Sequence, residues 1–175
     1  MIDSIDVNEI NDTAEGLIRD RTQADVDYAL SLERSMTYAY ENLKGAYNPS
    51  DRNRVGIAVN RIVEYLRHTG RYEIGAKIKQ DWNAYDIAKP GDNGAVLALL
   101  RHLKSLLPYD QTENVPDSLD GLTYQKANAV ENILYELYGA FSRLLESWLY
   151  CGDGHASEFD PFNWQGWDDA AGNHS

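Results

Sequence analysis

The fold of this chain is decided by residues 123–148, TYQKANAVENILYELYGAFSRLLESW. Apolar residues recur there every three or four positions, the spacing that gathers side chains on one side of an α-helix. Thr123 precedes the run, and threonine is a favoured helix cap. The apolar stripe consists of Ala127, Val130, Ile133, Leu134, Leu137, Phe141, Leu144, Leu145 and Trp148. The pattern predicts a helix about 39 Å long, which must bury this stripe against other elements.

Two amphipathic segments that precede this stretch predict further helices. One runs from Asp92, as its N-cap, to about Leu107, and Pro108 ends it. The other runs from Ser50, as its N-cap, to Thr69, and Gly70 closes it. In both segments the apolar residues keep the helical spacing of one buried face.

A fourth helix is predicted from Thr22 to about Lys44. Thr22 and Asp25 have the spacing of a capping box, in which each side chain binds a backbone amide of the first turn. Pro49 is expected to break the chain between this helix and the next, since proline cannot continue a helix.

The remaining segments show no helical period. Residues 1–20 alternate acids with isolated apolar residues and are expected to form an extended arm. Residues 71–91 fit a short strand or an extended connection better than a helix. Residues 151–175 are rich in Gly, Asp and large aromatic residues.

The predicted fold is therefore all-α, a bundle of about four amphipathic helices with an extended N-terminal arm and an irregular aromatic C-terminal tail. The expected organisation is an acidic arm at 1–20, a helical bundle domain at 21–150 and the tail at 151–175. A chain of 175 residues fits one such domain with its two arms.

The sequence composition indicates the compartment in which the protein is found. No apolar run approaches the roughly 20 residues of a membrane span, and acids stand where a signal peptide carries Lys or Arg. Cys151 is the only cysteine, so no intrachain disulfide is possible. We expect a protein made in a cytoplasm and kept there, or released by lysis.

Charge is placed unevenly along the chain. The net charge is −12, with 8 acids and 2 bases in residues 1–27, and 5 acids and no base in residues 151–175. Both ends would repel a phosphate backbone, so nucleic-acid binding through a basic face is not expected. The charge is still compatible with a protein whose acidic surface imitates DNA.

No motif in the sequence indicates an enzyme or a metal site. Cys151, Asp153 and His155 lie close together, but a zinc site needs further ligands and no second pair supplies them. The stretch 153–160 has neither the spacing nor the final Glu of a calcium loop. We expect no catalytic residue, no metal and no cofactor.

Two nearby carboxylates could serve as the general acid and the general base of an enzyme. Glu131 with Glu136, and Asp81 with Asp86, have carboxylates five residues apart. Residues five apart on a helix point about 140° apart, as 3.6 residues make a turn. Glu131 and Glu136 are therefore more simply interpreted as lying on solvated faces of an acidic protein.

The aromatic residues near the C-terminus are the candidate partner-binding residues: Phe159, Phe162, Trp164, Trp167 and Tyr150. Exposed in a Gly- and Asp-rich segment they would lower solubility unless they bury against something. Three readings stay open: docking into pockets of a neighbouring subunit, stacking on sugar rings, and folding back over the chain's own bundle.

Several motifs resemble a family of small helical proteins encoded in tail gene clusters of bacteriophages and prophages of Gram-positive bacteria. The resemblance covers about residues 19–150. It is carried by RTQADV at 21–26, LKGAYN at 43–48, DRNRV at 51–55, Asp81-Trp82, the helix at 95–106, LDGLTY at 119–124, Ala127-Asn128 and Glu131.

The resemblance implies a virion component at the tail tip or associated with a tail fibre, with no catalytic motif to carry over. This sequence departs from the family pattern in two places. The stretch between Val26 and Leu43 is shorter than the family pattern leads us to expect. At 151–154 the sequence is CGDG, where members of the family often carry a Ser-Gly-Glu type motif.

Three functions are compatible with these observations. The leading expectation is a structural protein of the phage tail, in several copies, that docks onto other tail proteins. The second is a module that binds cell-wall glycans of the host. The third is an acidic DNA mimic that inhibits a host nucleic-acid-binding protein, although its acids cluster at the ends instead of along a duplex-like row.

Overall fold

A computed structural model describes residues 7–32, 43–68, 77–106 and 113–152, with the backbone alone for 7–8 and 146–152. These residues form the helices α1 (Val7–Glu15), α2 (Gln23–Ser31), α4 (Pro49–His68), α5 (Pro90–Leu106) and α6 (Tyr124–Gly152), and no strand. The prediction of an all-α bundle is confirmed.

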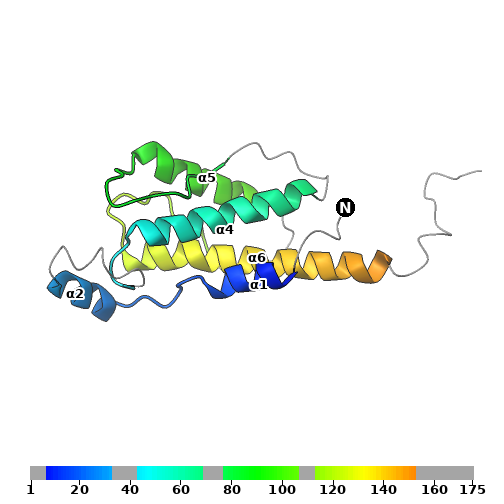
Figure 1. The fold of residues 1–175 in the computed structure, drawn as a ribbon, viewed down its shortest axis with the longest axis horizontal. Helices are drawn as coiled ribbons and strands as arrows, with labels where there is room; N and C mark the ends of the chain where they lie inside the picture. The colour runs from blue at the N-terminus through cyan, green and yellow to red at the C-terminus, as the bar shows by residue number, and fades with distance from the viewer. Residues whose placement is uncertain (1–6, 33–42, 69–76, 107–112, 153–175) are drawn as a thin grey trace, which may run out of the picture. The chain divides into compact units, whose positions relative to one another are not determined.

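The chain divides into two units, residues 1–142 and 143–175. Within the first unit, α4 lies between α5 and the first part of α6, and α1 runs beside that part of α6 (Figure 1). The described part of the second unit is the end of α6, residues 143–152.

The core of the first unit lies where α4 meets α6. The rings of Tyr65 and Phe141 stack with their centroids 5.5 Å apart, and the Tyr138 hydroxyl donates to the Ala58 carbonyl at 2.8 Å. The side chains of Ile62, Leu66, Ile133, Leu134 and Leu137 are fully buried. The apolar stripe predicted for residues 127–141 is thus the buried face of α6.

The expectation of an extended arm is wrong for residues 7–15, which form α1. Ile10 and Ala14 are buried, and their spacing of four places them on one face of the helix. Leu17, two residues past the end of α1, is buried as well. The apolar residues are few and are separated by acids, so their helical spacing is not apparent from the sequence. Packing against the bundle stabilises a helix that is too short to persist alone.

The predicted start of the helix at Thr22 is confirmed, but its predicted length is not. Thr22 caps α2 in a complete capping box with Asp25, and α2 ends at Ser31 because Leu32 has an extended backbone. The prediction of a single helix from Thr22 to Lys44 is therefore wrong, because the helix is interrupted at Leu32. Residues 33–42 lie outside the described part of the chain.

Two other helices begin one or two residues before the predicted caps. Asn48, not Ser50, caps α4, because its Oδ1 accepts from the amides of Ser50 and Asp51. Pro49 is the first residue of α4. Pro90 likewise begins α5, and the Asp92 carboxylate accepts from the Lys89 amide. Proline suits the first helical position, where no amide donor is needed.

Residues 77–89 form an extended connection with one turn at Ala84 and Tyr85. Of the two predicted alternatives for 71–91, the described residues take the extended connection; residues 71–76 lie outside them. The Thr123 cap of α6 is confirmed by the hydrogen bond from the Lys126 amide to its Oγ1 at 3.4 Å.

Candidate functional site

Four charged side chains meet inside the first unit. Glu131 of α6 and Asp51 of α4 are the acids, and both accept a hydrogen bond from Arg21 Nη2 at 2.8 Å. The side chains of Arg21, Asp51 and Glu131 are at most 3% exposed. Arg54 completes the set with bonds to Glu131 at 3.0 Å and a contact with Asp51. We call these four residues the buried charge cluster.

The cluster is internally neutral, and every oxygen of its two carboxylates accepts at least one hydrogen bond. Glu131 accepts from Arg21, from two Arg54 nitrogens and from the Ile18 amide at 2.6 Å. The second Asp51 oxygen accepts from the Asn48 amide at 2.9 Å. Burial alone would lower the pKa of Arg54, but its hydrogen bonds to Glu131 and Asp51 outweigh burial and raise it.

Glu131 is therefore not on a solvated face, and that prediction is wrong. Its charge is tolerated because two guanidinium groups replace water around it. With no exposed surface and no free lone pair it cannot reach a substrate proton. Asp81 is exposed, and its carboxylate contacts Lys79 at 2.8 Å.

Three asparagines bind single residues of extended chain, a feature that the sequence gave no reason to expect. In each case the side-chain amide accepts from the backbone N–H and donates to the C=O of one residue, as a neighbouring β-strand would. Asn128 of α6 binds Arg21. On α4, Asn60 binds Ile78 and Asn53 binds Trp82, at 2.6 to 2.9 Å. We call these the asparagine clamps.

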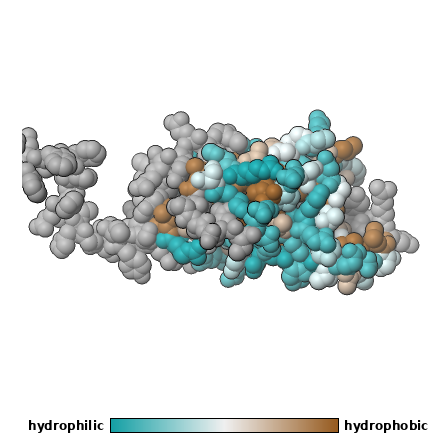
Figure 2. All heavy atoms as spheres, turned by 180° about the vertical axis from the view of Figure 1, so that it is seen from behind, coloured by the Kyte–Doolittle hydropathy of each residue, from teal (hydrophilic) through white to brown (hydrophobic). Residues whose placement is uncertain are grey.

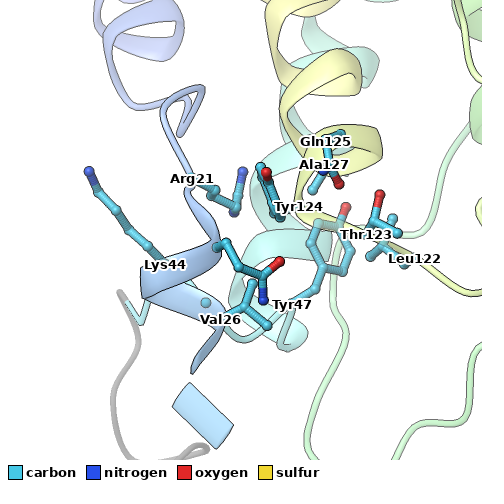
Figure 3. A pocket seen from close by; sticks show the side chains of 11 residues that line it. Arg21, Val26, Lys44, Tyr47, Leu122, Thr123, Tyr124, Gln125 and Ala127 are labelled. Atoms are coloured by element: carbon cyan, nitrogen blue, oxygen red, sulfur yellow. The ribbon is translucent and has the colours of Figure 1, made fainter. Parts of the chain in front are cut away.

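A pocket of about 380 Å³ lies beside the buried charge cluster, at the start of α6. Figure 3 shows Lys44 on one side, Leu122 and Thr123 on the other, and Tyr47 between them. Both cations of this pocket are already paired, since Lys44 contacts Asp20 at 2.7 Å and Arg21 belongs to the cluster. It offers an anion no free positive charge.

A second hollow region lies along residues 77–88. Two cavities of about 210 and 360 Å³ share Tyr47, Arg52 and Trp82 as lining residues. The Arg52 guanidinium lies over both rings, 5.5 Å from the centroid of Tyr47 and 5.3 Å from that of Trp82. We call this region the Arg52 groove. Its other lining residues include Val55, Lys77, Ile78, Lys79, Asn83, Asp86, Ile87, Asp92, Asn93 and Leu119.

Large apolar side chains reach the solvent at the edge of this groove. Tyr85 is 95% exposed and Ile87 is 86% exposed. In the view of Figure 2, hydrophilic residues cover most of the described surface and hydrophobic ones lie in separate small patches. This face thus favours small docking points over one broad apolar patch.

The candidate partner-binding residues of the sequence lie beyond what the structure describes. Phe159, Phe162, Trp164 and Trp167 lie outside the described residues, as do Asp153 and His155. Tyr150 lies in α6, with only its backbone described. Sequence reasoning missed the Arg52 groove, and the one available signal was the resemblance motif that includes Trp82.

Within the described ranges, no three His, Cys, Asp or Glu side chains are placed to hold a metal ion. No helix among the described residues is both long and apolar enough to cross a membrane. Comparisons with protein-family models, curated proteins and solved structures found no match to this chain.

Proposed function

We propose that this chain is a structural component of a bacteriophage tail, at the tail tip, in the baseplate or on a tail fibre, and that it acts by docking onto other proteins. The assignment to a tail rests on the sequence resemblance over residues 19–150. The docking mechanism rests on the surface described above.

The residues that carry the resemblance support a structural reading. Arg21, Asp51, Arg54, Asn128 and Glu131 all belong to resemblance motifs, and together they form the buried charge cluster and one asparagine clamp. Their interactions are with one another inside the bundle. A shared pattern of this kind specifies a fold and does not require a common reaction.

The observation that carries the docking proposal is the exposure of Tyr85 and Ile87 on an anchored connection. The clamps at Asn53 and Asn60 hold this connection against α4. Two large apolar side chains lie within three residues and are almost fully exposed. A pre-ordered apolar loop loses little conformational entropy on binding, which favours a role in assembly.

Mass spectrometry of purified particles from the phage or prophage that encodes the chain tests the assignment. We expect the protein in stoichiometric amounts at the tail, located there by antibody labelling. Its absence from particles would overturn the tail proposal and favour an inhibitor that acts inside the cell.

A double variant, Tyr85→Ser with Ile87→Ser, tests the docking loop. We expect folded protein, checked by circular dichroism, that is no longer incorporated into particles. Leu30→Ser is the matched control, because Leu30 is a comparably exposed apolar residue on α2. Equal incorporation of the double variant and the wild type would contradict a role for this loop.

A further inference from the structure

We propose that the Arg52 groove binds the acidic, aromatic C-terminal segment, residues 153–175, of a neighbouring copy of this chain. The proposal rests on the docking function above and adds to it one partner, a second copy, and the site at which it binds.

Two positively charged side chains of the groove form no ion pair with any other described residue. Among the described residues, neither Arg52 nor Lys77 forms an ion pair with a carboxylate, whereas Lys79 contacts Asp81 and Asp86. Arg52 instead donates to Asn93 Oδ1 at 3.0 Å. In a chain with net charge −12, free cations in a hollow favour an acidic ligand.

The groove also presents aromatic surface beside these cations. Trp82 is partly exposed, and Arg52 lies over both its ring and that of Tyr47. The Asn53 clamp and the hydrogen bond from Trp82 Nε1 to the Lys79 carbonyl at 3.1 Å fix the indole in place. A fixed aromatic ring next to Arg is the combination that hot spots of protein interfaces favour.

Residues 153–175 complement both properties. They contain the acids Asp153, Glu158, Asp160, Asp168 and Asp169 and no Lys or Arg. The aromatic residues Phe159, Phe162, Trp164 and Trp167 lie between Glu158 and Asp168, so acids flank the aromatic stretch on both sides. An acidic aromatic peptide can therefore fill the hollow with a ring while its carboxylates face Arg52 and Lys77.

Among the described residues, two acids line the groove and limit where the ligand's carboxylates can lie. Asp86 lines the larger cavity and contacts Lys79 at 3.5 Å. Asp92 lines the smaller cavity, and its carboxylate accepts from the Lys89 amide at 2.8 Å. The peptide's carboxylates are therefore expected at Lys77 and Arg52, and its aromatic rings against the apolar lining residues, which include Val96 and Leu119.

Each copy would offer one groove and one C-terminal segment, two different surfaces. Contacts between unlike surfaces join copies head to tail, which closes a ring or extends a filament. Fully extended, 23 residues reach up to roughly 75 Å, so the segment is long enough to span to another copy. This arrangement agrees with several copies around a tail axis.

Fluorescence anisotropy of a labelled peptide with the sequence of residues 153–175 tests the groove. The titrant is the full-length chain carrying Trp164→Ala and Trp167→Ala, so that its own segment competes weakly. We expect saturable binding that Lys77→Glu weakens about tenfold, the loss of one hot-spot contact. No binding, or binding that Lys77→Glu leaves unchanged, would overturn the proposal.

The matched control is Arg67→Glu, the same charge reversal on α4 about 22 Å from Arg52 along the helix; Arg67 is exposed. It should leave peptide binding unchanged, and an equal loss in Arg67→Glu would show that only net charge matters. Arg52→Glu should abolish binding. If Arg52→Glu fails to fold, the exposed Lys77 decides alone.

Sedimentation velocity of the unlabelled wild-type chain tests the neighbouring copy. We expect association that increases with concentration and is lost in the Trp164→Ala, Trp167→Ala double variant. A wild-type chain that stays monomeric at all concentrations would overturn the proposal, and so would a groove that binds cell-wall glycan but not the peptide. Neither result depends on the presence of the protein in particles, so the two proposals fail separately.

Discussion

Glu131 holds a negative charge where no water reaches it, with four hydrogen-bond donors around its carboxylate. Two of the donor groups are guanidinium groups, which stay protonated at any ordinary pH. Removing one partner of such a pair costs more than the pair itself contributes, because the remaining charges stay buried without compensation. Loss of any one member of the cluster is therefore expected to destabilise the fold.

Replacement of Glu131 by Gln tests this at the residue scale. The amide keeps the size of the carboxylate but leaves Arg21 and Arg54 with one acid between them, so we expect a loss of about 3–5 kcal/mol in the free energy of unfolding. Urea denaturation followed by circular dichroism measures the loss. Glu64→Gln, on an exposed position of α4, is the control and should change stability by less than about 0.5 kcal/mol. Equal stability of the two variants would show that the cluster is not needed.

At the scale of elements, the helix termini and the connection follow from local chemistry. Thr22 and Asp25 bind each other's backbone amides. The Asp25 carboxylate accepts from the Thr22 hydroxyl and from the Thr22 amide, and these two hydrogen bonds lower the pKa of Asp25. The extended connection has no strand beside it, so Asn53 and Asn60 supply the missing hydrogen-bond partners. Asn53 and Asn60 lie two turns apart on one face of α4, which is the spacing needed to hold Trp82 and Ile78.

Gly56 lies between the two clamps and allows this close approach. A Cβ at Gly56 would lie 2.5 Å from the Lys79 carbonyl oxygen, so Gly56→Ala must displace the connection. We expect Gly56→Ala to destabilise the fold by about 1–3 kcal/mol, measured by thermal unfolding.

Gly94→Ala is the control for this prediction. Gly94 lies in α5, where a Cβ would meet no atom within 4 Å. Alanine there should stabilise the helix by about 0.5–1 kcal/mol. The two alanines are thus expected to act with opposite signs. A stabilising Gly56→Ala would show that the connection does not pack against α4 as described.

For the molecule as a whole, two tyrosines are expected to make stability fall at alkaline pH: Tyr138, which is buried, and Tyr47, which is half-buried. Burial raises the pKa of the Tyr138 and Tyr47 phenols above the ordinary value of 10.0. Since the folded pKa is the higher one, the stabilising contribution is complete below pH 10 and is lost as pH rises further.

We therefore expect the free energy of unfolding to fall above pH 10, by about 1.4 kcal/mol for each of the two tyrosines at one pH unit above the ordinary pKa. Chemical denaturation between pH 8 and 11 measures this decline. Tyr138→Phe removes the hydrogen bond to Ala58 and should be less stable at pH 8, by about 1 kcal/mol, yet lose less stability between pH 8 and 11. A decline as steep as that of the wild type would contradict the assignment to Tyr138.

The sequence by itself determined the all-α class, the stripes that form the core of α4, α5 and α6, and the caps at Thr22 and Thr123. These follow from spacing and backbone chemistry within a few neighbouring residues, so they can be read from the chain directly. Helix α1 escaped prediction because its apolar residues are few and gain their burial from distant parts of the chain.

Only the tertiary structure decided what Glu131, Asn60 and Arg52 do. Residue spacing gives Glu131 a place on α6, but its burial depends on Arg21 and Arg54, which lie 110 and 77 residues away along the chain. The asparagine clamps and the Arg52 groove likewise join residues from separate segments. Hydrogen bonding and burial depend on distance in space, and the fold sets that distance for residues far apart in the sequence.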